Sequence, residues 1–388
     1  MDAEGIIVTS RFDEQQRAGG RLPGEALIDL YGSRQVAASI LLRAAEGSGR
    51  RHHLRTDRSP VLAEDPPLTV IAIDTSPRIE SVLEEAARLT RPGLVTARRT
   101  RLLADEIDPA WLGENPGEAT RLTVYFSRQD RVYQVPAFEA ACELLHRRGI
   151  AGATVLCGAD GTTRGRRQHA KFPHRDADVP VMVIAVGSGD RIGLVLPELG
   201  VMSRHPLMTI EKVLLCKRGG KLIIRPQAIP GTGGQDTLTR LKLTIYTSEA
   251  AQHEGQPVYR AITRELRSAG ISGATSARGI WGFHGDRAPH GDRFLQLRHR
   301  VPVVTTVTGA PEQADQAFDV IDKMTAERGL VTAETVTEVS AGRLPRRRSP
   351  PARSACTAGT RPGDPTGAAW TLSPPWRTAG PRAGNAEG

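Results

Sequence analysis

Three segments of the chain combine glycine, arginine and histidine in a way that suits anion binding. Their members are Gly47, Arg50, Arg51, His52 and Arg55 in the first segment, Gly161, Arg164, Arg166, Arg167 and His169 in the second, and Gly282, Phe283, His284 and Arg287 in the third. Glycine lets backbone N–H groups approach a ligand, and the guanidinium of arginine pairs with phosphate or carboxylate oxygens. We therefore predict that these residues bind a small anionic ligand. A solvated surface loop that needs glycine only to turn would have the same composition, and both interpretations stay open.

Other chemistries find less support in the same segments. His52 and His53 are adjacent, and no HxH, HExxH or CxxC spacing supplies the ligand geometry of a metal site, so no metal is predicted. No Ser–His–Asp or Cys–His arrangement recurs at matching positions of the three segments. We predict no catalytic residues and a protein that is not an enzyme.

The chain contains internal repeats, which is why such segments occur three times. RLTVYFS from Arg121 returns as KLTIYTS from Lys242, and RRGIAGATV from Arg147 returns as SAGISGATS from Ser268, each shifted by 121 residues. A more diverged copy at the N-terminus carries QVAASILLRAAEG from Gln35. Since a repeat of this length is one folding unit, the sequence predicts three domains. These are residues 1–103, 121–217 and 241–339, joined by linkers at 104–120 and 218–240.

Each repeat has the same predicted order of elements. In the third, residues 242–247 alternate like a half-buried strand, Pro257 opens a helix that Gly270 ends, and Pro311 opens a second helix. The order strand–helix–strand–strand–helix–strand is ferredoxin-like, an α+β fold with both helices on one face of an antiparallel sheet. In repeat two, Gly193 and Pro197 predict a shortened or broken second helix.

A sheet with helices on only one face must cover its other face. Leu243, Ile245, Val303 and Val124 are expected to make that open face apolar. Three copies in one chain are therefore predicted to close into a pseudo-threefold ring, a monomeric pseudo-trimer in which the open faces cover one another.

Most of the net positive charge lies outside the repeats, since residues 340–388 contribute +6 of the net +9 of the chain. Residues 340–388 contain eight Arg against Asp364 and Glu387, together with many Pro and Gly, which is typical of a disordered basic tail. The repeats themselves are only weakly basic and carry no nucleic-acid motif, so nucleic acid is not an expected partner. No apolar run approaches the 18 residues of a membrane span, and we expect a cytoplasmic protein.

Repeat three resembles a known family. LTIYTSEAAQHEGQPVYRAITRELRSAGISGATSARGIWGF, followed by VPVVTTV and RGLVTAETV, is similar to the PII-like family called domain of unknown function 190. GRRHHLRTDRSPVLAEDPPLTV in repeat one and RLTVYF, GIAGATVL and VPVMVIAV in repeat two resemble the same family. Because these motifs are mostly strands and turns, they identify a fold better than a chemistry.

The resemblance implies a regulatory role. Relatives in the broader PII group are trimeric signalling proteins that bind adenine nucleotides in clefts between subunits and dock a loop onto membrane transporters. Members of this subgroup often accompany a small fluoride-exporting channel. The Gly- and Lys-rich phosphate loop of that group is replaced here by RPGLVT, RHPLMT and RGLVT, so no resident cofactor is predicted.

The predicted function is a PII-like sensor of a small anion or adenine nucleotide at clefts between repeats. Its expected partner is a protein, with a membrane transporter or fluoride channel as the class that the resemblance implies. The alternative is a ligand-free adaptor whose long loops only dock a partner.

Overall fold

The structure is a computed structural model of the whole chain. It describes residues 3–13, 16–17, 20–48, 54–56, 67–103, 112, 115–163, 165–169, 179–202, 206–228, 238–271, 273–284, 288–291, 301–326 and 329–340. Contacts divide the chain into two units, residues 1–345 and residues 346–388. The described residues all belong to the first unit, and the tail predicted at 340–388 lies outside them except for its first residue.

The elements follow the predicted order in all three repeats. Repeat one contains β1 (Ala3–Asp13), α1 (Pro23–Ser33), β2 (Ala38–Arg43), β3 (Glu46–Ser48), β4 (Leu54–Thr56), β5 (Pro67–Thr75), α2 (Ser76–Thr90) and β6 (Leu94–Leu103). Repeat two contains β7 (Glu118–Ser127), β8 (Arg131–Val132), β9 (Val135–Pro136), α3 (Ala137–Arg147), β10 (Gly152–Cys157), β11 (Asp160–Thr163), β12 (Arg166–His169), β13 (Pro180–Gly187), α4 (Gly189–Val201) and β14 (Leu207–Arg218). A short strand β15 (Lys221–Leu222) and a 3₁₀ turn η2 (Pro226–Ala228) follow. Repeat three contains β16 (Thr239–Ser248), β17 (Gln252–His253), β18 (Gln256–Pro257), α5 (Val258–Ser268), β19 (Ala274–Arg278), β20 (Trp281–His284), β21 (His290–Gly291), β22 (Pro302–Gly309), α6 (Pro311–Met324) and β23 (Leu330–Val339).

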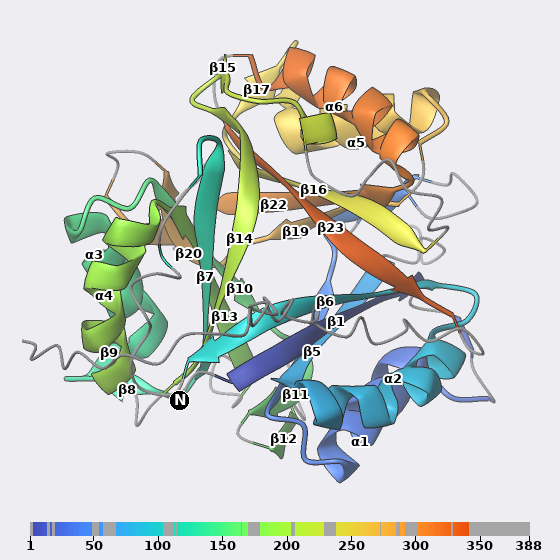
Figure 1. Cartoon of the computed structure of the whole chain (residues 1–388), viewed down its shortest axis with the longest axis vertical. Coiled ribbons are helices and arrows are strands. Elements are labelled where there is room, and N and C mark those ends of the chain that lie inside the picture. The colour runs from blue at the N-terminus through green and yellow to red at the C-terminus, as the bar shows by residue number, and fades with distance from the viewer. Residues whose placement is uncertain are drawn as a thin grey trace, which may run out of the picture. The chain divides into compact units, whose positions relative to one another are not determined.

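Each repeat builds a four-stranded antiparallel sheet in the ferredoxin-like order. The strand orders are β2–β5–β1–β6, β10–β13–β7–β14 and β19–β22–β16–β23. The helix pairs α1/α2, α3/α4 and α5/α6 lie on three different sides of the first unit, with the sheets between them (Figure 1). The predicted α+β class with three ferredoxin-like repeats is confirmed.

Local sequence explains the helices. In α5, Val258, Ile262 and Leu266 repeat every four residues and are all buried against the sheet. The chain enters α5 from Pro257 and leaves it through Gly270, whose φ of +73° is a conformation that glycine adopts without strain.

The second helix of repeat two is slightly shortened but not broken, so of the two predicted outcomes the structure shows the first. α4 runs continuously over 13 residues with Pro197 inside it, against 15 residues for α2 and 14 for α6. Proline removes one helical hydrogen bond, which would have joined it to the carbonyl of Gly193. Pro197 is on the exposed side of α4, so water can solvate that carbonyl.

Each repeat has one apolar core between its sheet and its helices, which makes three such cores. The residues in these cores show that the predicted orientation of the strands is wrong. Val124 belongs to the core under α3 and α4, while Leu243 and Ile245 belong to the core under α5 and α6. Val303 lies four residues before Val307, which belongs to the core under α5 and α6, so both side chains lie on the same face of β22. The predicted open-face residues therefore face the helices. The open faces instead carry their strand neighbours, many of which are polar.

A fourth apolar cluster joins the open faces of all three sheets. It contains Ile40 of repeat one, Tyr125 and Met182 of repeat two, and Tyr246 and Val304 of repeat three. Each sheet is therefore buried on both faces, by its own helices on one side and by the other two repeats on the other side.

Strands that cross from one repeat to the next link all three in a cycle. β3 of repeat one pairs with β19 of repeat three, β20 of repeat three pairs with β10 of repeat two, and β11 of repeat two pairs with β2 of repeat one. The last strands do the same, since β6 pairs with β14, β14 with β23, and β23 with β6. Each repeat therefore donates strands to both of its neighbours.

Candidate functional site

The glycines of the predicted anion-binding segments lie at these crossings. A Cβ atom on Gly161 would overlap the carbonyl oxygen of Ser39 in repeat one, and on Gly282 it would overlap the carbonyl of Ala153 in repeat two. On Gly47 it would lie 3.0 Å from the carbonyl oxygen of Ala274 in repeat three. The three equivalent glycines thus let the backbones of neighbouring repeats meet. This gives them a structural role, while a ligand at these positions stays a prediction.

Arg167 connects two repeats through ion pairs. Its Nη2 lies 2.9 Å from Oδ2 of Asp160 on β11, and its Nη1 pairs with Asp29 on α1 of repeat one. Arg166, its neighbour on β12, is exposed. The guanidinium of Arg167 is therefore held at the junction between repeats one and two.

The two ring side chains of the third segment differ in burial. Phe283 is fully buried and contacts the ring of His146 on α3 edge to face, with ring centres 5.0 Å apart. His284, on the same strand β20, is partly exposed. Phe283 thus packs in the core of repeat two, although it belongs to repeat three.

Several predicted site residues fall outside what the structure describes. For Arg55 on β4 and His169 on β12 only the backbone is described. Residues outside the described ranges altogether are Arg50, Arg51, His52, Arg164 and Arg287. Their proposed part in anion binding stays a prediction.

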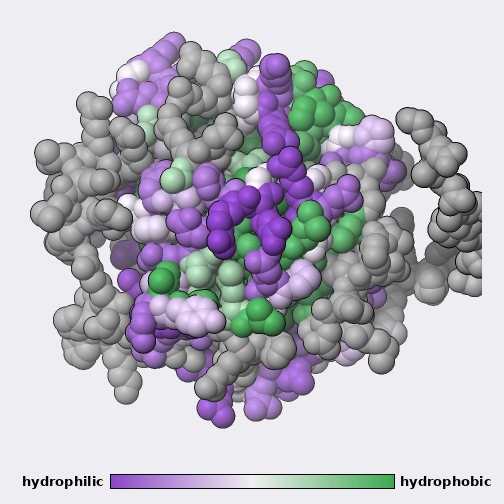
Figure 2. All heavy atoms as spheres, turned by 90° about the vertical axis from the view of Figure 1, so that its left-hand side faces the viewer, coloured by the Kyte–Doolittle hydropathy of each residue, from purple (hydrophilic) through white to green (hydrophobic). Residues whose placement is uncertain are grey.

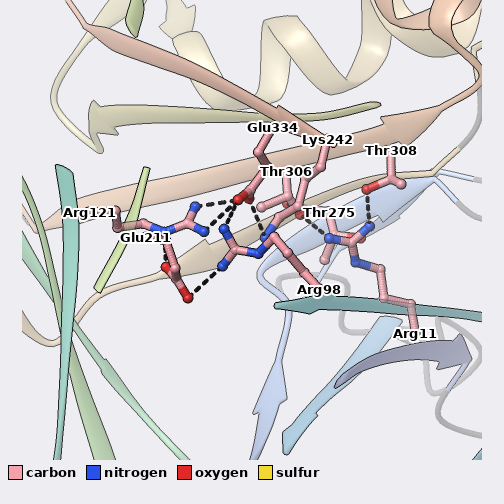
Figure 3. A network of polar contacts seen from close by, with 9 residues as sticks. All are labelled: Arg11, Arg98, Arg121, Glu211, Lys242, Thr275, Thr306, Thr308 and Glu334. Carbon is pink, nitrogen blue, oxygen red and sulfur yellow. Dashed lines mark hydrogen bonds and ion pairs between the residues drawn. The ribbon is translucent and has the colours of Figure 1, made fainter. Parts of the chain in front are cut away.

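A network of buried ion pairs occupies the centre of the three sheets (Figure 3). Glu334 on β23 accepts hydrogen bonds from Arg121 on β7 at 2.9 and 2.6 Å, and it pairs with Lys242 on β16 at 3.2 Å and with Arg98 on β6. Glu211 on β14 lies 2.9 Å from Arg121 Nε and 2.7 Å from Arg98 Nη2. The network contains charged side chains from all three repeats.

The network shifts the ionisation of its members. Burial alone would raise the pKa of Glu334, but Arg121, Arg98 and Lys242 outweigh it and hold that pKa well below the usual range. The pKa of Glu211 is also lowered, because the opposing effects of burial and of Glu334 are outweighed by Arg98 and Arg121. Burial lowers the pKa of Lys242 to about 8, against the opposing effect of Glu334. Both carboxyls are therefore ionised at neutral pH, whereas the ammonium form of Lys242 is less stable here than it would be in water.

Arg11 lies beside the network and differs from its other cations. It comes from β1 and donates to Thr308 Oγ1 at 2.6 Å and to Thr306 Oγ1 at 3.0 Å, both on β22 of repeat three (Figure 3). Burial lowers its pKa to about 10, with Glu334 opposing that shift. Both of these hydrogen-bond partners are hydroxyl groups rather than carboxylates.

Sequence reasoning missed this network, although a signal was present. Arg121 aligns with Lys242 under the 121-residue shift, so a cation recurs in a strand that otherwise alternates apolar residues. Arg98, Glu211 and Glu334 also occupy equivalent places, each two residues after a threonine in the last strand of its repeat. A charged residue that recurs inside a strand indicates a buried partner.

Repeat two exposes more large apolar side chains than the other repeats. Tyr133 is 97% exposed, and Leu194 and Val201 on α4 are 65% and 78% exposed. Figure 2 views the molecule from the side of α3 and α4 and shows hydrophobic residues bordering a hydrophilic middle. Among the described residues, the exposed large apolar side chains lie only in repeat two and in the segment just after it.

The described part of the chain contains neither a membrane-spanning helix nor a cluster of metal-binding side chains. No helix in the described ranges has both the length and the apolar character needed to cross a membrane. No group of three or more His, Cys, Asp or Glu side chains in the described ranges has the arrangement of a metal site.

The fold and its three interlocked repeats define a PII-like protein. The family described as DUF190, Uncharacterized ACR, matches residues 6–102, 119–215 and 240–338, and the chain belongs to this family. The UPF0166 protein of Aquifex aeolicus (strain VF5) is 31% identical over 94 residues, which are 24% of this chain and 88% of that protein. The relative is thus matched over about the length of one repeat.

Similarity to a solved structure is weaker. The crystal structure of aspartate kinase from Synechocystis matches with a TM-score of 0.23 and 12% sequence identity. The match covers 88% of this chain and 46% of that chain, so the chain spans less than half of the kinase. At this level the similarity supports no conclusion on function.

Proposed function

We propose that this chain is a non-enzymatic regulatory protein that senses a small anion or an adenine nucleotide where its repeats meet. The observation that carries the proposal is the crossing of β3, β11 and β20 onto neighbouring repeats. Each predicted ligand-binding segment begins on one of these strands. A ligand bound there would contact two repeats and report on how they fit together.

Arg167 supplies a physical route from binding to response. It pairs with Asp29 across the junction and with Asp160 in its own repeat. A phosphate group competes well for a guanidinium because it offers several charged oxygens. A ligand that drew Arg167 away from Asp29 would loosen α1 from the β11–β12 hairpin. The position of α1 would then depend on ligand.

A single chain is proposed to be the functional unit. The cyclic pairing of crossing strands and last strands supports this, because each repeat meets its two neighbours within the chain. Tethering also favours closure within a chain over association between chains. Light scattering after size exclusion should give a mass near 41.8 kDa. A stable trimer of chains would refute the proposal.

Ligand sensing is tested by thermal shift on the full-length protein with ATP, ADP, AMP and inorganic phosphate. A ligand should raise the melting temperature in a saturable way. Arg167→Ala should raise the ligand concentration needed for half of that shift about tenfold, since hydrogen bonds to charged groups are strong. Arg148→Ala is the matched control, because Arg148 forms an exposed pair with Glu198 on the outer side of repeat two.

The two functional hypotheses predict different results in this assay. A sensor requires a saturable shift that the combined change of Arg51, Arg167 and Arg287 to Ala removes. If a ligand bound equally well after all three changes, the proposed site would be wrong. If none of the four compounds produced a saturable shift, the ligand-free adaptor would replace the sensor.

A protein partner is proposed as the receiver of the signal, with a membrane transporter such as a fluoride channel as the class that family resemblance supports. The exposed apolar residues of repeat two favour its outer side as the contact, because such residues mark interaction surfaces. Leu194→Ser combined with Val201→Ser on α4 should reduce binding to reconstituted transporter at least tenfold. Unchanged binding would exclude this surface.

A further inference from the structure

A cavity of about 90 Å³ lies at the centre, between the open faces of the three sheets. On the same measure one water molecule needs roughly 10–15 Å³, so the cavity has room for a larger polyatomic group. All three repeats line it, and the lining includes Arg11, Arg98, Arg121, Lys242 and Glu211. It is separate from the loop segments in which the proposed function places its ligand.

Positive charge exceeds negative charge around this cavity. Four cations line it, and the two carboxylates of the network, Glu211 and Glu334, are both already paired with the cations. Four positive minus two negative charges leave an excess of two. No third carboxylate is among the described residues that line the cavity. Uncompensated buried charge is costly, and a bound anion would compensate it.

Hydroxyl groups also line the cavity, next to apolar side chains such as Ile7, Leu156 and Ile184. Thr9, Thr123 and Thr244 occupy the same place in the first strand of each repeat, because each lies directly opposite an equivalent threonine of the last strand. All three line the cavity and are at most 8% exposed. Each repeat thus contributes a threonine from the equivalent position to the lining.

Two hydrogen-bond donors of the lining have capacity to spare, while a third atom without a hydrogen bond, Glu211 Oε1, is an acceptor that already forms an ion pair with Arg98. Among the described residues, none provides a hydrogen-bond partner for Thr244 Oγ1 or for Arg11 Nε. Thr244 is only 3% exposed. Buried polar atoms in proteins are nearly always satisfied, so a donor left over at a cationic cavity indicates a ligand that accepts hydrogen bonds.

We propose that the central cavity binds a small tetrahedral oxyanion of the phosphate or sulfate class. Arg11 and Thr244 donate hydrogen bonds to it, and Arg98, Arg121 and Lys242 add favourable charge. An oxyanion suits this lining better than a halide, because several directional donors from different strands match several acceptor oxygens. The bound anion connects all three repeats at the point where their sheets meet.

The test is isothermal titration of the full-length protein with sodium phosphate and sodium sulfate, against sodium chloride at equal ionic strength. One of the two oxyanions should bind saturably at about one per chain, and the better one identifies the natural class. Thr244→Val and Arg11→Gln should each weaken binding about tenfold or more. Thr244→Val is the sharper variant, because it keeps the side-chain shape and breaks no hydrogen bond of the described structure.

The matched control is Arg225→Gln, which removes a cation that pairs with Asp315 and Asp319 outside the cavity. It should leave oxyanion binding unchanged. The proposal is overturned if neither oxyanion binds more tightly than chloride, or if binding survives both cavity variants. Loss of binding in Arg167→Ala with full binding in Thr244→Val would move the site to the loop segments and also overturn it.

Discussion

Glu334→Gln offers the most direct test of the central network. The carboxylate of Glu334 pairs with Arg121, Arg98 and Lys242 and is 6% exposed. A neutral amide of the same shape would leave these three cations with Glu211 as their only carboxylate in the network. Removing one partner of a buried ion pair costs about 3–5 kcal/mol, a large part of the roughly 5–15 kcal/mol that stabilises a typical domain.

Urea denaturation at pH 7, followed by circular dichroism, measures that loss. Glu198→Gln is the control, since its pair with Arg148 is exposed on both sides and such pairs contribute about 1 kcal/mol or less. If Glu334→Gln lost as little unfolding free energy as the control, the ion pairs of the network would contribute no more to stability than exposed ion pairs do. The reasoning on its charges would then be wrong.

The same variant should alter the response to acid. The pKa of Glu334 is lowered in the folded protein, so its stabilising effect is complete above its unfolded pKa of about 4.3 and is lost as pH falls through the folded value. The wild-type protein should therefore lose stability below about pH 4.3 more steeply than Glu334→Gln. If the unfolding free energies of the two proteins fell equally steeply below about pH 4.3, the lowered pKa of Glu334 would be contradicted.

Further predictions concern the junctions and the ionisation of the centre. Gly161→Ala should cost about 1–3 kcal/mol, because its new Cβ would overlap the Ser39 carbonyl, whereas Gly200→Ala, where the nearest atom is 3.9 Å away, should be neutral or stabilising by up to about 1 kcal/mol. Urea denaturation distinguishes the two, and equal effects would contradict a close contact at the crossing. Lys242 should titrate near pH 8 in lysine-selective NMR, because burial lowers its pKa. Between about pH 8 and 10.4 the unfolded chain then binds more protons at this lysine, so stability should rise with pH in wild type relative to Lys242→Met.

The positions of the helices and strands could be predicted from the sequence, whereas the face that each strand turns toward its helices could not. The helix of repeat three was correctly predicted from Val258, Ile262 and Leu266, because apolar spacing of three to four residues has a single helical interpretation. A strand has two faces, and in β7 both were buried, so alternation could not tell which one met the helices. Val124 was placed on the wrong face for this reason, and the polar face with Arg121 and Thr123 went unnoticed.

The predicted site shows a related limit. Gly161 was interpreted as a place where backbone meets ligand, and the structure shows backbone meeting backbone of another repeat. Both uses need the absence of a Cβ atom, so the residue type alone does not separate them. Which strand lies opposite depends on contacts between distant parts of the chain, and these leave no local pattern in the sequence.

Joining the three repeats in one chain has a consequence for what its centre can contain. Positions 98, 211 and 334 are equivalent but hold Arg, Glu and Glu, and the positions opposite them hold Ile7, Arg121 and Lys242. In an assembly of three identical chains, one residue type would meet itself around the axis, and three like charges there would repel. Covalent linkage removes that constraint of symmetry. Each copy can mutate alone, so opposite charges can face one another where a symmetric trimer would be limited to neutral or self-compatible residues.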